Sequence, residues 1–533
     1  MGATVAAEEP QRHRSNLAAL AADAATAAPD RTALVDERRH LTWAQLVEES
    51  TRVADGLSAL GLIAGHRVAL LLGNRAEFVT GYLAALGAGM VAVPLNPSSA
   101  TGELVRVLAD CTARVVVCDS ATATVARAAV AGLTDALEGA DEALRARTVA
   151  PRVVVVDTPA LPGETAYDAL GTEPLAARGR AAPPQDPETL AVLLYTAGTS
   201  GRPRAAMLPH RALLANIEQT AAISPPPVGA DDNVLAVLPL FHVYGLNAVL
   251  GQVLRHRACL VMAERFEVER TLDLVAEHGV TNVPIAPPAV AAWASRDDLR
   301  DRLRGVRTVL SGASPLAPEV ARRFEQASGL PVHQGYGLTE AAPVVTSTLC
   351  SPGGAPKPGS VGSPLPGVEV RIVDDGGGDV GGEDPGELWV RGPNLFCGYW
   401  PDGEGAPDAD GWYATGDVGY LDGDGDLFLV DRLKEIVIVS GFNVYPVEVE
   451  AAIDEVEGVA EVAVIGAPAD DDQGERVVAY VVADPGLPDH VADGLAEAVR
   501  AHCETRLAPF KRPREVHVVE RLPHSVTGKV AKG

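Results

Sequence analysis

Residues 67–95, RVALLLGNRAEFVTGYLAALGAGMVAVPL, contain the pattern that decides the fold. RVALLL is a short apolar run that is typical of a buried strand, and MVAVPL at 90–95 repeats that pattern. Between the two runs, residues 75–88 carry apolar side chains at helical spacing. A strand, a helix and a second strand in this order predict two parallel strands that are connected by a helix.

The same alternation continues through most of the chain. Runs such as ARVVVCD, LAVLLYT and RTVLSG have the composition of strands, whereas 271–278 and 318–328 have the spacing of helices. Buried apolar strands that alternate with helices predict mostly parallel, helix-covered sheets in two pseudo-repeated subdomains. Between 350 and 386 the sequence changes to Gly- and Pro-rich turns with shorter alternating strands, which predicts a smaller β-rich subdomain.

A separate unit is predicted after the strand LFLVD at 427–431. It contains a helix that starts near Pro446, two strands, a further helix and a last strand, which is typical of a small α+β domain. We therefore predict an α/β protein with a large N-terminal domain over 1–431 and a small α+β domain over 432–533. The join between them has no flexible linker, so we expect it to act as a short hinge.

The composition excludes several classes of protein. A net charge of −27 argues against nucleic acid as a main partner, because phosphate binding needs clustered Lys and Arg. Six cysteines without a C-x-x-C pair indicate reduced thiols and not a disulfide framework or a zinc site. The first residues lack the apolar run of a secretory signal, and the longest apolar stretch is too short to span a bilayer. We expect a cytoplasmic protein with no transmembrane segment.

The segment YTAGTSGRPRAA, residues 195–206, directly follows a predicted strand. Its glycines and hydroxyl residues provide backbone N–H groups and side-chain hydroxyls that can surround an anion, and Arg202 and Arg204 add positive charge. It is not a P-loop, because G-x-x-x-x-G-K-[ST] is absent. Taken alone, the segment is about as compatible with a polar turn that leaves a strand.

A second motif, HQGYGLTEAAP, follows a predicted helix and a short strand. Gly335 and Gly337 would let a ligand approach the backbone closely, and Tyr336 offers a flat face for a base. Thr339 and Glu340 supply a hydroxyl for a phosphate and a carboxylate for Mg²⁺. A helix N-cap is the simpler interpretation of Thr339 alone, but it does not explain the whole cluster.

Two later segments add single candidates. Asp417 follows a tight turn and can accept hydrogen bonds from ribose hydroxyls. The nearby DGDGD at 422–426 is not a calcium loop, because Leu427 and Leu433 stand where that loop needs Gly and Glu, so a hairpin turn is predicted. Near the end of the chain, LPHSVTGKV contains Lys529, which on its own has the character of a solvated lysine.

Taken together and in this order, these segments resemble the adenylate-forming superfamily of acyl-CoA synthetases, luciferases and peptide-synthetase adenylation domains. The resemblance covers essentially the whole chain and is closest to fatty-acid–CoA ligases. It implies that ATP and Mg²⁺ activate a carboxylic acid as acyl-AMP with release of pyrophosphate. The acyl group would then pass to the thiol of coenzyme A, and AMP would be released.

The resemblance also implies the roles of individual residues. It matches Lys434 to the hinge between the domains, and it matches Lys529 to a catalytic lysine. The residues implied are Lys529, His242, Thr339 and Glu340 for catalysis; Thr196, Ala197, Gly198, Thr199, Ser200, Gly201 and Arg204 for the β- and γ-phosphates; Ser311, Gly312, Ala313, Gln334, Gly335, Tyr336 and Gly337 for the adenine; Thr339 for the α-phosphate; Asp417 and Arg432 for the ribose; Gly441 for the thiol tunnel; and Glu340 for Mg²⁺.

The phosphate loop departs from the family pattern. Arg204 stands where the family usually has Lys, and Ala205 stands where it usually has Gly. Arginine keeps the positive charge but presents a more rigid, planar fork of donors. We therefore predict an active enzyme with an altered KM for ATP.

The acid and the acceptor are less closely defined. The segments expected to line the acyl pocket, HVYGLN, VPIAPPAV and SGAS, are mostly small and apolar, which favours a fatty or similar apolar acid over a diacid. An aryl or branched acid stays possible. No Asp follows the Phe241 region to hold an amino group, which disfavours a peptide-synthetase domain. Two alternatives stay open: loading of a carrier protein's phosphopantetheine, and a non-catalytic nucleotide-binding relative.

Overall fold

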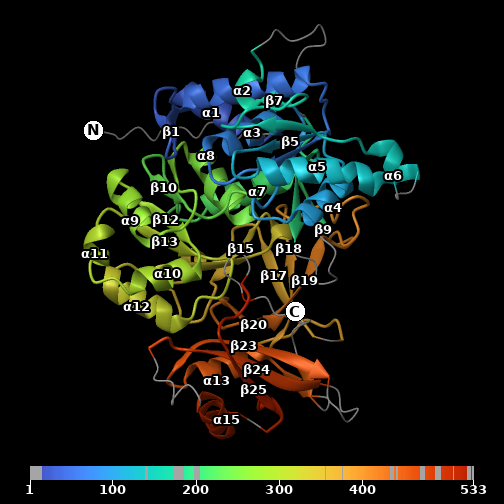
Figure 1. The fold of residues 1–533 in the computed structure, drawn as a ribbon. Helices are drawn as coiled ribbons and strands as arrows, with labels where there is room; N and C mark the ends of the chain where they lie inside the picture. The colour runs from blue at the N-terminus through green and yellow to red at the C-terminus, as the bar shows by residue number, and fades with distance from the viewer. Residues whose placement is uncertain are drawn as a thin grey trace, which may run out of the picture.

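The computed structural model describes residues 15–138, 142–172, 185–196, 204–353, 356–374, 376–432, 437–439, 442–468, 475–486, 494–507, 509–524 and 530. Two large sheets with helices between and around them make up most of the N-terminal part (Figure 1). The elements from β23 to β25, coloured orange to red, gather at one end of the molecule. Within the described part of the chain, no helix is both long and apolar enough to cross a membrane.

The opening stretch RVALLLGNRAEFVTGYLAALGAGMVAVPL forms two central strands of a seven-stranded sheet. The predicted helix is α3, and the strands on either side of it pair in parallel, as do all pairs in this sheet except the last. In spatial order the strands are β7 (Thr165–Ala166), β6 (Arg152–Val155), β5 (Val115–Cys118), β3 (Arg67–Leu71), β4 (Val91–Pro94), β8 (Leu190–Thr196) and β9 (Arg204–Pro209). The helices around it are α2 (Trp43–Ala59), α3 (Ala76–Gly87), α4 (Thr101–Cys111), α5 (Ala123–Glu138) and α6 (Glu142–Arg147), with the short η1 (Tyr167–Ala169).

A nine-stranded sheet repeats this architecture. Its six central strands are parallel, and both edges are antiparallel. In spatial order they are β16 (Ser363–Pro364), β15 (Val344–Ser347), β14 (Val332–Gly337), β13 (Thr308–Ser311), β12 (Asn282–Ile285), β10 (Asn233–Ala236), β11 (Cys259–Met262), β1 (Thr32–Val35) and β2 (His40–Thr42). The helices and short turns are α1 (Ala19–Ala27), α7 (His210–Ala221), the π-helix η2 (Tyr244–Gly251), α8 (Gln252–His256), α9 (Val268–Glu277), α10 (Pro287–Ala294), α11 (Leu299–Arg302), α12 (Pro318–Ser328), η3 (Thr339–Ala341) and η4 (Thr348–Cys350).

The two sheets enclose the largest hydrophobic core. That core joins one face of each sheet to α1, α2, α3, α7 and α8, which therefore form a middle layer. The outer face of the seven-stranded sheet packs on α4 and α5, and the outer face of the nine-stranded sheet packs on α9, α10 and α12. Because their strands are covered on both faces, the sequence shows continuous apolar runs. The predicted fold class of helix-covered, mostly parallel sheets is confirmed.

The remaining strands form smaller units. The β-rich subdomain is an antiparallel sheet of β17 (Glu369–Val373), β18 (Gly386–Arg391), β19 (Trp412–Leu421) and β20 (Leu427–Arg432). The last unit, with its own hydrophobic core, contains β21 (Val437–Val439), β22 (Phe442–Val444), α13 (Pro446–Asp454), β23 (Val459–Pro468), β24 (Glu475–Ala483), α15 (Leu495–Arg506), η5 (Pro509–Lys511) and β25 (Glu515–Val519). The domain boundary at 431/432 stays a prediction.

Two local predictions can be compared directly with the structure. DGDGD forms the turn between β19 and β20, as expected for a hairpin. The Lys357 Nζ lies 2.6, 2.8 and 3.0 Å from the carboxylates of Asp422, Asp424 and Asp426, so a lysine neutralises this acidic turn. The region after the predicted phosphate loop was not expected to be a strand, but β9 begins at Arg204 and pairs with β8.

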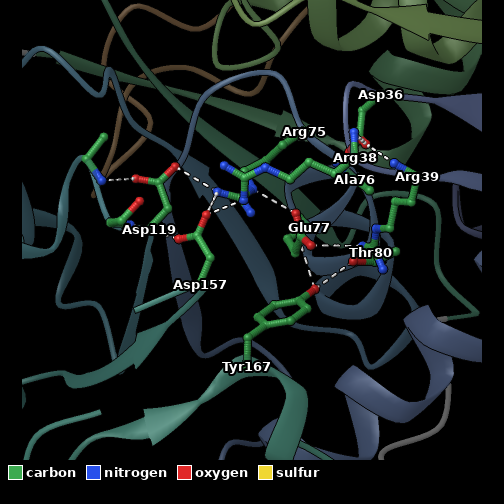
Figure 2. Close-up of polar contacts among 12 residues, drawn as sticks. Asp36, Arg38, Arg39, Arg75, Ala76, Glu77, Thr80, Asp119, Asp157 and Tyr167 are labelled. Carbon is green, nitrogen blue, oxygen red and sulfur yellow. Dashed lines mark hydrogen bonds and ion pairs between the residues drawn. The ribbon is translucent and has the colours of Figure 1, made fainter. Parts of the chain in front are cut away.

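A partly buried group of charged side chains, the Arg75 cluster, lies at the carboxyl ends of β3, β5 and β6, and its Arg75 and Asp119 are buried (Figure 2). It consists of Arg75, Glu77, Asp119 and Asp157. The Arg75 Nε lies 2.7 Å from Glu77, and its Nη1 lies 3.1 Å from Asp119 and 3.2 Å from Asp157. Burial alone would raise the pKa of Asp157, but hydrogen bonds from Arg38, the Ser120 N–H and Arg75 lower it to about 2.

Candidate active site

The residues predicted to hold the adenine lie at the carboxyl ends of β13 and β14. Ser311 and Gln334 are direct neighbours on these parallel strands, and Gly312 and Ala313 follow Ser311 immediately. Ala313 has a φ of 75°, a left-handed conformation that costs energy for a residue with a Cβ. In open α/β sheets, ligands bind outside the carboxyl ends of the strands. The position is therefore the one that the fold offers to a ligand.

Polar groups at this edge lack partners of their own. The Ser311 Oγ is buried without a hydrogen-bond partner among the described residues. The residue Gln334 is 8% exposed; its backbone N–H donates to Thr348, but its side-chain amide makes no hydrogen bond to the described part of the chain. Because an unsatisfied buried polar group costs about 1–3 kcal/mol, the Ser311 hydroxyl is suited to a polar ligand, and the Gln334 side-chain amide beside it is available to the same ligand.

The structure gives the glycines of the second motif a packing reason, and their predicted role toward a ligand stays a prediction. A Cβ on Gly337 would lie 2.3 Å from the Pro343 carbonyl oxygen, and one on Gly335 would lie 2.8 Å from that of Thr346. Both Cβ positions would therefore collide with backbone atoms of β15 or of the residue just before it. The two glycines are therefore required by strand packing, whatever a ligand needs in addition.

Thr339 and Glu340 lie in the turn η3 directly after β14. The N-cap of this turn is Leu338, so the simpler interpretation of Thr339 as a capping residue is wrong. The residue Glu340 is 9% exposed, and among the described residues no Lys, Arg or His lies within ion-pair distance of its carboxylate. A buried carboxylate without a basic partner is an energetically costly group that a bound cation would stabilise.

Asp417 lies on β19, where its backbone pairs with that of Arg432. The two residues predicted to hold the ribose are thus cross-strand neighbours. The Tyr336 hydroxyl donates a hydrogen bond to the Asp417 Oδ2. This contact joins the predicted adenine and ribose positions although they lie on different sheets.

Tyr399, which the sequence gave no reason to select, connects two predicted phosphate-handling groups. Its hydroxyl donates to the Glu340 Oε1 at 2.6 Å, and the guanidinium carbon of Arg204 lies 3.9 Å from its ring centroid. Burial and the nearby Glu340 carboxylate raise the pKa of Tyr399 strongly, so the phenol stays protonated and donates. Burial likewise raises the pKa of the adjacent Tyr413 to about 12. Only alignment with relatives could have indicated Tyr399.

The donors present fit a magnesium ion that is shared with a nucleotide. Among the described residues there is no group of three or more His, Cys, Asp or Glu that could hold a metal. Magnesium in nucleotide sites is usually held by one or two carboxylates together with phosphate oxygens and water, so it does not need such a cage. The single buried carboxylate of Glu340 matches that arrangement.

A cavity of about 220 Å³ lies beside this edge. It brings together the three segments that were expected to line an acyl pocket. Asn74 holds the backbone segment that leads to His242. Its Nδ2 donates to the carbonyl oxygens of Ala236 and Leu238, and its Oδ1 accepts from the Leu240 N–H. The cavity is lined by Val237, Leu238, Pro239, His242, Tyr244, Gly245, Glu264, Arg265, Phe266, Ala286, Ala289 and Ala313.

Several predicted residues cannot be placed. Thr196 and Arg204 pair across the β8–β9 hairpin and mark the two ends of the predicted phosphate loop. For Arg432 the structure describes only the backbone. The predicted residues that lie outside the described part of the chain are Ala197, Gly198, Thr199, Ser200, Gly201, Lys434, Gly441 and Lys529.

Comparison with known proteins gives the family. Residues 21–400 match the family model described as AMP-binding enzyme, and residues 448–529 match the AMP-binding enzyme C-terminal domain. The chain belongs to the AMP-binding enzyme family.

Individual members of the AMP-binding enzyme family are similar over nearly the full chain. The 4-coumarate–CoA ligase-like 9 of Oryza sativa subsp. japonica is 33% identical over 531 residues, which cover 96% of this chain and 90% of the relative. A long-chain-fatty-acid–CoA ligase of Bacillus subtilis is 32% identical, with 97% and 93% covered. The crystal structure of ATP-bound MatB from Rhodopseudomonas palustris is similar with a TM-score of 0.83 and 31% identity, and 97% of each chain is covered.

Membership confirms the predicted superfamily and the kind of enzyme. The chain is an AMP-forming acyl- or aryl-CoA ligase that uses ATP, Mg²⁺ and coenzyme A. The roles of individual residues stay predictions.

Proposed function

We propose that this chain activates a compact carboxylic acid with an apolar body as its acyl-adenylate and then transfers the acyl group to coenzyme A. The observation that carries the proposal is the contact between Tyr399 and both Glu340 and Arg204. This contact brings a buried carboxylate and an arginine together in the same region as the Tyr336–Asp417 contact and the Ser311 hydroxyl, which has no partner among the described residues. These contacts thus connect groups from three sheets that are suited to a base, a ribose and a triphosphate.

The nucleotide would lie across these groups. Residues 311–313 and 334–337 would hold the adenine, and Asp417 with Arg432 would hold the ribose. The loop over 196–204 would hold the β- and γ-phosphates through its N–H groups and hydroxyls. When bound at Glu340, Mg²⁺ would neutralise charge on the phosphates.

In the first step, a carboxylate oxygen of the acid attacks the α-phosphorus, and the bond to the β-phosphate breaks. Pyrophosphate leaves, so negative charge develops that donors at fixed positions can stabilise. Thr339 would donate to the α-phosphate, Lys529 would supply a positive charge, and His242 would lie beside the acid's carboxylate.

In the second step, the thiol sulfur attacks the carbonyl carbon of the mixed anhydride. AMP leaves with the electron pair of the broken bond, and the thiol proton passes to solvent. We propose that the domain over 432–533 rotates between the steps about a hinge near Lys434. One orientation would bring Lys529 to the site, and the other would bring Gly441 to the path of the thiol.

The cavity supports a compact, apolar acid. Its volume of about 220 Å³ is below the roughly 300–1,000 Å³ of pockets that hold drug-sized ligands, which favours an aryl or short branched acid over a long fatty chain. Most of the lining is apolar, and Arg265, the one arginine among its described residues, is exposed and lies 2.6 Å from Glu267. A diacid would lack a buried arginine for its second carboxylate.

The proposal is tested by an acid panel with and without coenzyme A. We expect acid-dependent exchange of pyrophosphate into ATP without coenzyme A, and an acyl-CoA detected by mass spectrometry with it. Aryl and short branched acids should exceed palmitate in kcat/KM. An acyl group found only on an added carrier protein would replace coenzyme A as acceptor, and no exchange with any acid would revive the non-catalytic alternative.

The catalytic lysine needs its own variant. We expect Lys529→Ala to lower pyrophosphate exchange by on the order of 10²–10³-fold, because it removes a positive charge from the transition state of the first step. Reaction of a synthetic acyl-adenylate with coenzyme A should change far less. Normal exchange by Lys529→Ala would show that the assignment is wrong.

We also propose a cytoplasmic location. The support is the set of six free cysteines, four of them buried, which suits a reducing compartment.

A further inference from the structure

Tyr399 lies between two groups on which the proposed function depends. Its hydroxyl binds the Glu340 Oε1, and its ring supports the Arg204 guanidinium. The backbone around it is fixed on both sides. The Phe396 N–H donates to the Glu340 carbonyl oxygen at 2.8 Å, and the Trp400 N–H donates to that of Ala205 at 2.8 Å. The segment 396–400 therefore sets the distance between the metal-binding turn and the end of the phosphate loop.

We infer that Tyr399 is a positioning residue for magnesium-bound ATP. The inference rests on the proposed roles of Glu340 and Arg204. The hydroxyl occupies one oxygen of the Glu340 carboxylate, and the described residues leave the Oε2 without a hydrogen bond, so that oxygen is available to the ion. The ring holds the Arg204 guanidinium by a cation–π contact, which limits the orientations of a long and flexible side chain.

The contact with Tyr399 explains why arginine suits position 204, where the family usually has lysine. A planar guanidinium stacks on an aromatic face better than a compact ammonium does. The second contact of Arg204, with the exposed Glu404 at 3.5 Å, is weak by comparison because solvent screens it. Tyr399 is thus the main described support for the arginine.

A purely structural role for Tyr399 makes a different prediction. Its ring packs edge-on against Phe396 with centroids 5.1 Å apart, and phenylalanine would keep that packing. If packing were its whole contribution, Tyr399→Phe would leave metal binding unchanged. If the hydroxyl positions Glu340, the same variant weakens metal binding while the fold is retained.

The experiment compares Tyr399→Phe with the unmodified chain. Mn²⁺ binding is measured by electron paramagnetic resonance with ATP present and no acid, so that no turnover occurs. We expect the Kd for Mn²⁺ to rise about 10-fold, the low end for residues that orient a metal ligand. The Mg²⁺ concentration that gives half-maximal pyrophosphate exchange should rise in parallel, whereas the KM for the acid should not change. Tyr399→Leu also removes the ring, so the KM for ATP should rise further.

Two controls separate the possible results. Tyr420→Phe makes the same chemical change on β19, where Tyr420 stacks on Phe428 with centroids 5.1 Å apart, and it should leave Mn²⁺ binding unchanged. Glu340→Gln tests the underlying metal role. If Glu340→Gln weakens Mn²⁺ binding but Tyr399→Phe does not, the inference is overturned and the proposed function stands. If neither variant weakens it, both the metal role of Glu340 and the inference are overturned.

Discussion

At the carboxyl ends of β13 and β14, in the nine-stranded sheet, the buried Ser311 hydroxyl and the Gln334 side-chain amide have no partners among the described residues. At the carboxyl ends of β3, β5 and β6, in the seven-stranded sheet, Arg75 pairs with Asp119 and Asp157 (Figure 2). Both edges occupy the position where open α/β sheets bind ligands. The same architecture thus serves as a site on one sheet and as an internally paired cluster on the other.

The two edges differ in whether their polar and charged groups already have hydrogen-bond or ion-pair partners within the protein. The Arg75 cluster contains opposite charges that are held together by short contacts, which lowers the cost of their burial. The site has a carboxylate, Glu340, that no described cation neutralises. We therefore expect substitutions in the cluster to lower stability and substitutions at the site to lower activity.

The largest effect is expected from Arg75→Ala. It removes the common partner of three carboxylates. Glu77 keeps its contact with Arg39 and Asp157 keeps its contact with Arg38, but buried Asp119 is left without a described cation, so the free energy of unfolding should fall by about 3 kcal/mol, the low end for breaking a buried pair. Urea unfolding of the N-terminal domain measures the change. Arg304→Ala breaks an exposed pair with Asp301 and should cost less than about 1 kcal/mol. A raised KM for ATP in Arg75→Ala with unchanged unfolding would show that this edge is itself a ligand site.

The sequence predicted the strands and helices well wherever local pattern decides them. The predicted helix at 318–328 coincides with α12, because its apolar face and its first-turn Pro318 are local features. It did not predict β9, which forms because residues from Arg204 onward pair with β8. The segment before β9 is polar and rich in glycine, so the local pattern indicated a loop and gave no signal for the strand that follows.

Only the site residues that lie within recognisable sequence motifs could be predicted. Glu340, Asp417 and Arg204 were found because each lies in a recognisable segment. Tyr399 was missed, because its partner Glu340 lies 59 residues away and nothing in the local pattern marks that contact. The Arg75 cluster was missed for the same reason, since Asp119 and Asp157 are 44 and 82 residues from Arg75.

Glu340→Gln tests the site and is expected to lower activity instead of stability. We expect kcat/KM to fall on the order of 10²-fold, because the amide is a poor magnesium ligand and charge in the transition state is left less stabilised. Stability should be unchanged or slightly higher, because a buried charge without a basic partner is removed. Pyrophosphate exchange and thermal unfolding provide the two measurements. A large loss of stability would show that Glu340 stabilises the fold, as the Arg75 cluster is expected to do.

Ser311→Ala should have a smaller effect that is confined to the nucleotide. Its Oγ makes no hydrogen bond to the described residues, so stability should change by less than about 0.5 kcal/mol. If the hydroxyl binds the nucleotide, the KM for ATP should rise about 2- to 10-fold, the value of one neutral hydrogen bond. The matched control is Ser328→Ala, whose buried Oγ donates to the Phe324 carbonyl oxygen at 2.7 Å. That variant should lose about 1 kcal/mol of stability with no change in KM.

The smallest effect concerns the pH dependence of the Arg75 cluster. Contacts with Arg38, the Ser120 N–H and Arg75 lower the pKa of Asp157 from 3.8 to about 2, so its contribution to stability is present above about pH 4 and is lost as the pH falls through 2. Asp157→Asn removes a group that titrates, and asparagine tolerates the positive φ of 49° at this position. The difference in urea midpoint between the unmodified chain and Asp157→Asn should therefore shrink between pH 5 and pH 2. In an Arg38→Gln background the same difference should be smaller at pH 5, because one cause of the lowered pKa is gone. A difference that stays constant across this range would show that Asp157 does not couple the cluster to pH.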